Sequence, residues 1–302
     1  MKRRFSGSVT FFQGMAMGAA DVVPGVSGGT VAYILGIYER LINALGGFKG
    51  PAIKSLLTGH WRRFWQLMDG TFLLLLFSGI VTSIATLARL ISWILEFHPQ
   101  LLWAYFFGLI VASCFYIGRQ FDIRHPLNIT AFMIAALLAF ALTTQAPVKL
   151  NPSYPVVFLS GCIAICAMVL PGISGSFILV LLGMYQPIIN AVKAFEASVL
   201  ACFIAGCITG LLSFTHLLAW LLRSFHALTL AALTGFMVGS LNKVWPWKAQ
   251  VMTADGYIEQ TVSPLQYQQL VDQDPQIAMV LMVATLGLMT VYLLNRAGNG
   301  NN

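Results

Sequence analysis

The chain has 302 residues, of which 58% are hydrophobic and only 9% charged, and its mean hydropathy is +0.80. A soluble chain carries about 25% charged residues, so this composition excludes a soluble globular protein and indicates a polytopic helical membrane protein. The net charge of +7 does not indicate nucleic acid binding, because the basic residues lie in short polar stretches between apolar segments.

The first apolar segment, residues 8–45, is interrupted by a Pro/Gly/Ser-rich stretch at 21–30. The pattern predicts two half-helices, about 9–22 and 30–45. Neither is long enough to cross a bilayer, which takes about 20 residues. Pro24 and the adjoining glycines interrupt helical hydrogen bonding, so the segment is either one broken span or a re-entrant hairpin.

Polar and apolar stretches alternate after this segment. Residues 46–70 are basic and contain Trp61 and Trp65, which is typical of a segment at the membrane surface. Further membrane spans, a second broken segment and a polar loop are then predicted along the chain. The predicted spans are about 71–95, 101–118, 127–146, 198–222, 227–243 and 276–294; the second broken segment is about 156–192, and the polar loop is 244–275.

The two halves of the chain are copies of one unit. At an offset of 147 residues, Pro24 matches Pro171, Ser27 matches Ser174, and the similarity continues over some thirty positions. At an offset of 127, later spans match as well, including Gly79 with Gly206. We therefore expect a single integral membrane domain over 1–302, with repeat one at about 8–146 and repeat two at about 154–296.

The distribution of basic residues predicts the topology of these repeats. If both broken segments are re-entrant and the N-terminus is cytoplasmic, twelve Lys/Arg face the cytoplasm and four face outward, whereas two single crossings give no better than ten to six. The re-entrant model places three crossings between the breaks, so the repeats are inverted and both termini are cytoplasmic. Broken helices at matching positions of inverted repeats are typical of a transporter's binding site.

The two breaks carry the residues expected to bind substrate. Half-helix N-termini, serine and threonine hydroxyls and flexible glycines together favour an anion or phosphate. The alternative is that these small residues merely allow close helix packing. The candidate residues in the two breaks are Pro24, Gly25, Ser27, Gly28, Gly29, Thr30, Pro171, Gly172, Ser174, Gly175 and Ser176.

Arg89 and His216 occupy matching positions inside two spans. Basic residues within a membrane are costly and mark functional sites, so we expect both to face the anion. Two alternatives stay open: Arg89 extends to the membrane surface, or His216 relays protons.

Acidic residues near the first break are candidates for binding a coupling ion, a proton or sodium. Asp21 has no acidic counterpart, because the matching residue is Met168; it either caps the adjacent half-helix or binds the ion. Glu39-Arg40 lies at the end of the second half-helix, where an ion pair at the interface is favoured over a substrate contact, and Glu39 is the second coupling candidate.

No metal site, cofactor or enzymatic activity is expected. The five cysteines lie in apolar segments without a CxxC pair and are interpreted as packing residues. Gly-x-Ser-Gly occurs in both breaks and resembles intramembrane serine proteases, with His216 as the base. Duplication of the pattern argues against that alternative, since a protease needs a single nucleophile.

The chain resembles a bacterial family described as polyprenyl-phosphate (undecaprenyl-phosphate) translocases, formerly a domain of unknown function. The resemblance is carried by residues 14–30, Gly-Met-Ala-Met-Gly-Ala-Ala-Asp-Val-Val-Pro-Gly-Val-Ser-Gly-Gly-Thr, and by residues 170–176, Leu-Pro-Gly-Ile-Ser-Gly-Ser. It covers essentially the whole chain. It implies a flippase in the bacterial cytoplasmic membrane that returns undecaprenyl phosphate for reuse in cell-envelope synthesis, with membrane lipids as its surroundings. An exporter of small soluble anions is the alternative within the same class.

Overall fold

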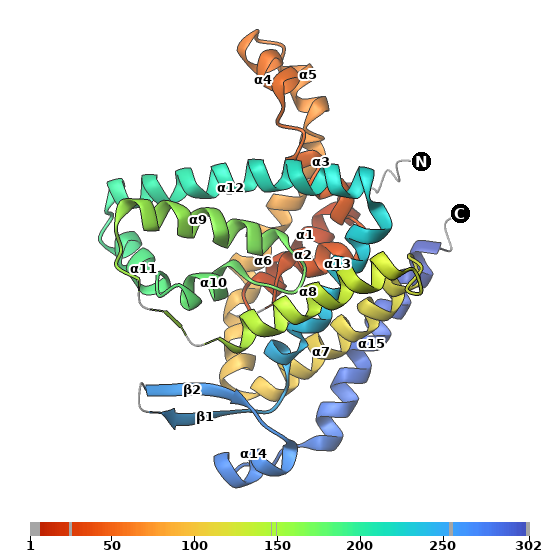
Figure 1. The fold of residues 1–302 in the computed structure, drawn as a ribbon, viewed down its shortest axis with the longest axis vertical. Helices are drawn as coiled ribbons and strands as arrows, with labels where there is room; N and C mark the ends of the chain where they lie inside the picture. The colour runs from red at the N-terminus through yellow and green to blue at the C-terminus, as the bar shows by residue number, and fades with distance from the viewer. Residues whose placement is uncertain (1–6, 24–25, 146, 149, 254–255, 300–302) are drawn as a thin grey trace. The chain divides into compact units, whose positions relative to one another are not determined.

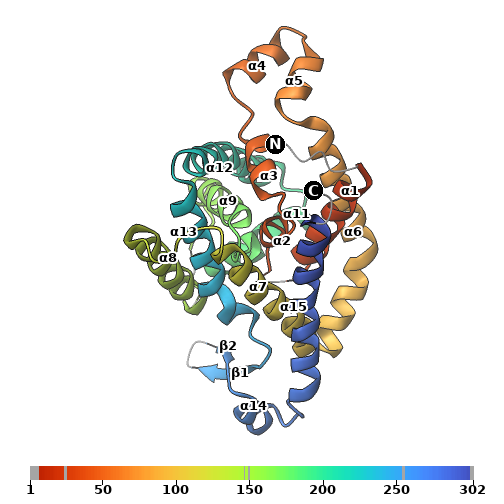
Figure 2. The same ribbon diagram turned by 90° about the vertical axis from the view of Figure 1, so that its right-hand side faces the viewer.

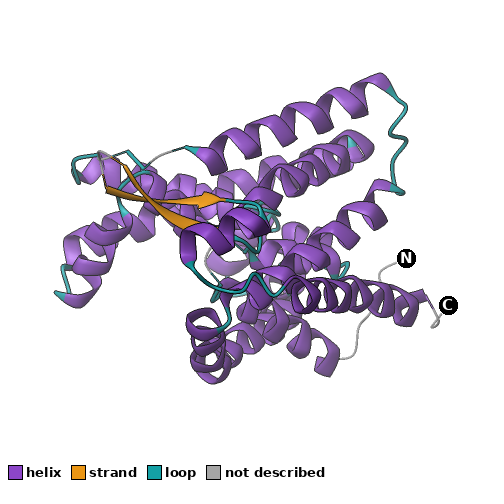
Figure 3. Ribbon diagram, turned by 90° about the horizontal axis from the view of Figure 1, so that it is seen from below, coloured by secondary structure: helices purple, strands orange, loops and turns teal. Residues whose placement is uncertain are grey.

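The computed structural model describes residues 7–23, 26–145, 147–148, 150–253 and 256–299, and most of them are helical (Figures 1 and 3). The helices of the first half are α1 (Gly7–Asp21), α2 (Gly28–Ile34), α3 (Tyr38–Leu45), α4 (Gly50–Leu57), α5 (Trp61–Leu67), α6 (Gly70–Phe97), α7 (Pro99–Gly118) and α8 (Pro126–Thr144). The helices of the second half are α9 (Tyr154–Val169), α10 (Gly175–Leu181), α11 (Tyr185–Lys193), α12 (Ala197–Ser224), α13 (His226–Gly239) with the 3-10 turn η1 (Ser240–Val244), α14 (Pro264–Val271) and α15 (Ile277–Asn299).

Six helices in the described residues are long and apolar enough to cross a membrane. They are α6, α7, α8, α12, α13 together with η1, and α15. Each coincides with one of the predicted spans to within a few residues. The protein is therefore an all-α polytopic membrane protein, as its composition predicts.

The predicted polar loop at 244–275 contains regular structure that the sequence analysis missed. Strands β1 (Lys248–Thr253) and β2 (Gly256–Thr261) pair antiparallel, with Lys248 opposite Thr261. Helix α14 follows, and Ser263 and Gln266 form a capping box at its start. This Ser-x-x-Gln signature is a readable helix-start signal. Neither strand alternates apolar and polar residues along its whole length. The strands are therefore recognised from their pairing in the structure and not from the sequence pattern.

The second broken segment forms a hairpin that returns to the side where it began. Gly175, at the start of α10, lies against Ala164 of α9, eleven residues earlier in the chain. At the end of α10, Leu181 O accepts a hydrogen bond of 2.7 Å from Val148 N, which precedes α9. The chain therefore folds back on itself, as a re-entrant segment does.

Each hairpin contains a second bend that the predicted half-helices did not include. The expected helix at 30–45 is divided into α2 and α3 by a turn at Gly36, and the matching Gly183 divides α10 from α11. Their φ angles are +69° and +68°, a left-handed conformation that glycine adopts without strain. Across the second of these turns the chain bends by 108°. The prediction of one unbroken half-helix over 30–45 was wrong, because nothing in the residues around Gly36 marks this glycine as left-handed.

The chain divides into two compact units, and each unit contains corresponding parts of both repeats. One unit comprises Met1–Arg89 and Pro147–Thr229, and the other comprises Leu90–Ala146 and Leu230–Asn302. The first therefore holds both hairpins with most of α6 and all of α12, while the second holds the end of α6, α7, α8, most of α13, and α15.

Glycine-lined interfaces hold the hairpins to their long helices in the first unit. A side chain at Gly14 or Gly79 would overlap backbone across the α1–α6 interface, and one at Gly161 or Gly206 would do so across the α9–α12 interface. Close approach of backbones is how membrane helices associate, because lipid supplies no hydrophobic drive between them. The thiol of Cys162 donates to Gly206 O at 3.0 Å across the second interface, consistent with a packing role for this cysteine.

The second unit also has glycine-lined helix interfaces, but each of them joins a helix of one repeat to a helix of the other. Gly108 of α7 packs on Ala284 of α15, and the matching Gly235 of α13 packs on Phe132 of α8. The second span of each repeat thus lies against the last span of the other repeat.

Candidate functional site

The first break joins α1 to α2 and ends in a capped helix start. Ser27 is fully buried, and its hydroxyl accepts a hydrogen bond of 3.0 Å from Gly29 N. This is an ordinary N-cap, which satisfies a backbone donor that the helix leaves unpaired. Pro24 and Gly25, which were predicted to contribute to the site, lie outside the described residues.

Asp21 supplies a second cap to the same helix. Its Oδ1 atom accepts a hydrogen bond of 2.7 Å from Gly28 N, so a carboxylate occupies the place where an anion would bind at the start of α2. The side chain is half-buried. Of the two interpretations of Asp21, this bond supports the cap, while its role with a coupling ion stays a prediction.

The second break joins α9 to α10 and lacks these caps. Pro171 and Gly172 are buried, and the φ of Gly172 is +95°. Ser174 makes no side-chain cap to α10; its hydroxyl lies 2.7 Å from that of Ser176. Because Met168 stands where the first repeat has Asp21, no carboxylate from that position approaches the start of α10.

The two breaks contact each other through direct hydrogen bonds. The Ser27 hydroxyl donates to Met168 O at 2.9 Å and lies 3.5 Å from Leu170 O. In the reverse direction, Gly172 N donates to the Thr30 hydroxyl at 2.8 Å. Residues some 140 positions apart in the sequence are thereby joined at one place, within a single compact unit.

Two further residues fix this contact. Tyr38, which is 2% exposed, donates its hydroxyl to Val169 O at 3.1 Å. A side-chain carbon at Gly29 would lie only 2.8 Å from Val169 O and 3.0 Å from Met168 O. Tyr38 was not among the predicted site residues, although its match with Tyr185 in the other repeat was a readable signal.

The structure brings together most of the described residues that were predicted to bind an anion. The residues of the first break face backbone carbonyls and an amide of the second, and the Ser27 hydroxyl both donates and accepts a hydrogen bond there. Ser176 is exposed, and the Ser174–Ser176 pair is bonded only to itself among the interactions described. Hydroxyl donors available to an anion are therefore concentrated in the second break.

Arg89 and His216 are not joined to the breaks by any hydrogen bond or ion pair in the described residues. Arg89 is exposed on α6. The Nδ1 atom of His216 is hydrogen-bonded to Leu212 O in its own helix, so this nitrogen carries a proton. In the described part of the chain neither Ser27 nor Ser174 is bonded to His216, as a serine nucleophile and its base would be.

Glu39 and Arg40 each form an ion pair, but with different partners. The Arg40 guanidinium binds Asp69 at 2.7 Å and 3.1 Å and lies over the ring of Phe72. Glu39 Oε1 lies 2.9 Å from His226 Nε2, and both side chains are half-exposed. These contacts tie α3 to the starts of α6 and α13 within the first unit, in line with the expected structural ion pairing.

These features define a class of protein: a multi-pass helical membrane protein built from two copies of a unit, each with a broken hairpin and three spans, in which the two breaks touch. This is an arrangement found in secondary transporters.

Comparison with known proteins places the chain more closely. Residues 17–261 match the VCA0040-like family, described as undecaprenyl phosphate translocase-like, and the chain belongs to this family. It is 45% identical to a polyprenyl-phosphate transporter of Vibrio cholerae over 93% of this chain and 94% of that protein. It is 31% identical to a polyprenyl-phosphate transporter of Staphylococcus aureus over 79% of this chain and 86% of that protein. No solved structure matches.

Proposed function

We propose that the protein is a transporter that moves undecaprenyl phosphate across the bacterial cytoplasmic membrane, with both termini on the cytoplasmic side, and so recycles the lipid carrier of cell-envelope synthesis. Membership of the family and the names of the two relatives support the substrate. The observation that carries the mechanism is the direct contact of the two breaks through Ser27, Thr30 and Gly172.

The lipid phosphate binds between the breaks in this proposal. Its oxygens accept hydrogen bonds from Ser174 and Ser176, and from Ser27, Thr30 and the Gly172 amide once these leave their present partners. Charge-assisted bonds to phosphate are stronger than the neutral bonds they replace, which offsets the cost of separating the breaks. The polyprenyl tail stays in lipid. Binding on one side, then on the other, gives alternating access.

Asp21 is the residue through which a coupling ion enters this proposal. Its carboxylate repels a phosphate that approaches the start of α2, so binding is favoured when Asp21 is protonated or paired with a cation. Glu39, near the end of the same hairpin and bonded to His226, is the second candidate. We expect Asp21→Asn to flip lipid at a rate independent of a pH or sodium gradient, whereas the wild-type protein responds to one of them. An Asn variant that keeps the wild-type gradient response would exclude Asp21 from coupling.

The proposal is tested by reconstitution in liposomes. The transfer of undecaprenyl phosphate between leaflets is measured for wild type, for Ser27→Ala/Ser174→Ala and for Arg89→Ala, with uptake of inorganic phosphate measured in parallel. Loss of two hydroxyls that bind a charged group is expected to slow flipping by about tenfold or more. Ser153→Ala, which removes an exposed hydroxyl that makes no cap, is the matched control.

Two results would contradict the proposal. Flipping at the wild-type rate by correctly folded Ser27→Ala/Ser174→Ala protein would remove the binding site from the breaks. Transport of inorganic phosphate without flipping of the lipid would make the protein an exporter of small anions. The role of Arg89 in the substrate path is tested by its own variant. If Arg89→Ala flips the lipid at the wild-type rate, Arg89 acts only at the membrane surface.

A further inference from the structure

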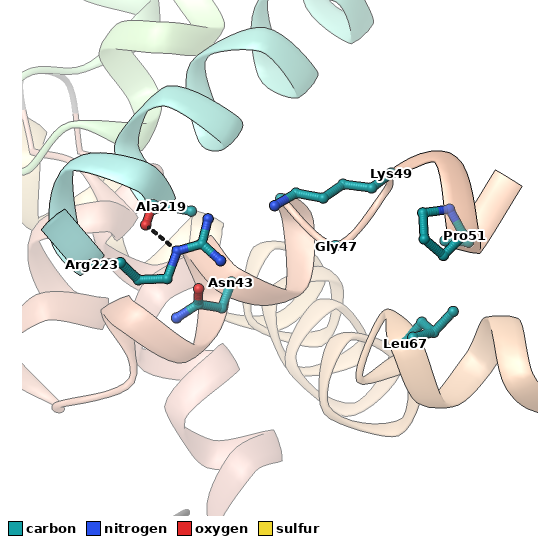
Figure 4. A pocket seen from close by; sticks show the side chains of 9 residues that line it. Asn43, Gly47, Lys49, Pro51, Leu67, Ala219 and Arg223 are labelled. Carbon is teal, nitrogen blue, oxygen red and sulfur yellow. Dashed lines mark hydrogen bonds between the residues drawn. The ribbon is translucent and has the colours of Figure 1, made fainter.

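A cavity lies away from the breaks, where α3 ends, α4 begins and α12 ends. Its volume is about 230 Å³, and its lining includes Asn43, Lys49, Pro51, Ala219 and Arg223. Figure 4 shows the side chains of Lys49 and Arg223 extending toward one another from the α3–α4 connection and from α12. All of these elements belong to the first compact unit.

The charge lining this cavity is positive and uncompensated. No carboxylate is among its lining residues. Glu39 of α3 and Asp69, which directly precedes α6, are engaged with other partners: Glu39 with His226 and Asp69 with Arg40. In the part of the chain that the structure describes, neither Lys49 nor Arg223 forms an ion pair. Two cations that face one cavity repel each other, and a bound anion removes that cost.

The helix dipole favours the position of one of these two cations, Arg223, but not that of Lys49. Arg223 lies in the last turn of α12, and its Nε donates to Ala219 O at 3.0 Å, a common way to satisfy a helix C-terminus. Lys49, in contrast, is the N-cap residue of α4 and makes no capping bond. A positive charge is unfavourable at a helix N-terminus unless an anion lies between them. The position of Lys49 therefore points to a ligand rather than to helix stabilisation.

The surroundings of the cavity indicate a lipid ligand. Helices α4 and α5 extend away from the hairpins of this unit (Figures 1 and 2) and expose Trp61 and Trp65 beside Arg62 and Arg63. Exposed tryptophan next to arginine is typical of a segment at the headgroup level of a membrane. The cavity is smaller than the 300 Å³ or more of sites for drug-sized ligands, so it fits a headgroup and not a whole lipid.

We propose that this cavity binds the phosphate of a lipid headgroup at the membrane surface, as a second anion site separate from the breaks. Lys49 contributes a point charge from the start of α4. Arg223, oriented by its bond to Ala219 O, presents its remaining guanidinium N–H groups, and the Asn43 amide lines the same space. The headgroup belongs either to undecaprenyl phosphate, for which the cavity is a docking site beside the transport path, or to an anionic phospholipid that anchors the protein.

The test measures lipid binding by the full-length protein, using native mass spectrometry in neutral detergent. The probes are undecaprenyl phosphate, phosphatidylglycerol, phosphatidylcholine and inorganic phosphate. Removing both charges in Lys49→Gln/Arg223→Gln is expected to weaken binding of a phosphate-bearing anionic lipid by about tenfold or more, because two charge-assisted hydrogen bonds to the phosphate are lost. Lys54→Gln/Arg62→Gln removes the same charge from exposed positions outside the cavity and is expected to change binding by less than about twofold.

The outcomes separate the two sources of the headgroup. Selective loss of undecaprenyl phosphate assigns the cavity to the substrate, and equal loss of phosphatidylglycerol assigns it to anionic lipids in general; both support the site. An effect on inorganic phosphate alone, or equal losses in the cavity and control variants, would overturn it. Lys49→Arg/Arg223→Lys keeps both charges but changes the hydrogen-bond donors, so it is expected to lose less binding than the Gln variant; a loss as large as in the Gln variant would also overturn it. Failure of the transport proposal is recognised separately, because that proposal is tested by flipping in liposomes with Ser27→Ala/Ser174→Ala and not by lipid binding to the cavity variants.

Discussion

Tyr38 and Tyr185 occupy the same position in the two repeats but differ in their surroundings. Tyr38 is buried and bonded to Val169 O, whereas Tyr185 is 41% exposed and makes no hydrogen bond in the described residues. Tyr38→Phe removes that bond and leaves the half-buried Val169 carbonyl without it, which costs about 1 kcal/mol. We expect a thermal unfolding midpoint several degrees below wild type in detergent, and no measurable shift for Tyr185→Phe. Equal shifts for both would mean that the bond does not stabilise the hairpins.

Gly29 lets the two breaks approach each other closely. A methyl group at this position would lie 2.8 Å from Val169 O, so Gly29→Ala must push the second break away. Overpacking of this kind costs about 1–3 kcal/mol. We expect a lower unfolding midpoint and a changed flipping rate, measured on the same reconstituted protein. Gly50→Ala makes the same change at a position with open space around it and should match wild type; a Gly29→Ala protein as stable as this control would contradict the contact.

At the scale of elements, the interfaces of the long helices rely on glycines four residues apart. Gly206 and Gly210 of α12 face α9, and the matching interface has Gly14 and Gly18 on α1 facing α6. Gly206→Ala places a carbon in overlap with Phe158 O, so a helix shift must follow despite alanine's better helix propensity. We expect a reduced yield of folded protein by size-exclusion chromatography. Gly118→Ala, with nothing near it, is the control; similar yields for the two variants would show that the interface tolerates a wider separation.

The spans were predictable because each is an apolar run of the length that a bilayer requires. The hairpin shape was predictable from Pro171 and its repeat mate together with the distribution of basic residues. The bend at Gly36 was not, because a left-handed glycine inside an apolar run has the same letters as a packing glycine. The strands at 248–261 were missed for a related reason: their pairing depends on a partner strand and not on a pattern within either one.

The candidate site was predictable in its outline and not in its partners. Duplication of the break implied that the two copies meet, and Ser27 and Thr30 do contact the second copy. The atoms to which they are hydrogen-bonded depend on the backbone conformation around Gly172. That conformation cannot be predicted from the residue types alone. The mate of Asp21 is Met168, and the structure shows the result of that asymmetry: one half-helix carries a carboxylate cap and the other does not.

For the whole molecule, the re-entrant topology makes a prediction about sidedness. In a variant without the five native cysteines, single cysteines at Asn151 and Glu196 flank the second hairpin, and both are exposed. If the hairpin is re-entrant, a membrane-impermeant thiol reagent labels both from the outside of intact cells. A cysteine at Arg63, on the polar segment of the first repeat, is labelled only after the cells are opened. Labelling of Asn151 and Glu196 from opposite sides would show that the segment crosses once.

The pairing of α7 with α15 and of α13 with α8 governs how the protein is made. Ala284 lies 176 residues beyond its contact partner Gly108, so α7 leaves the translocon long before the ribosome has synthesised the helix that covers its glycine face. In the same way, α8 is inserted before α13, the helix that packs on it, has been synthesised. During this interval lipid or an insertion chaperone must cover both faces. A gene cut between α8 and α9 would therefore yield two polypeptides that can each form neither of these contacts alone, and only co-expression would restore them.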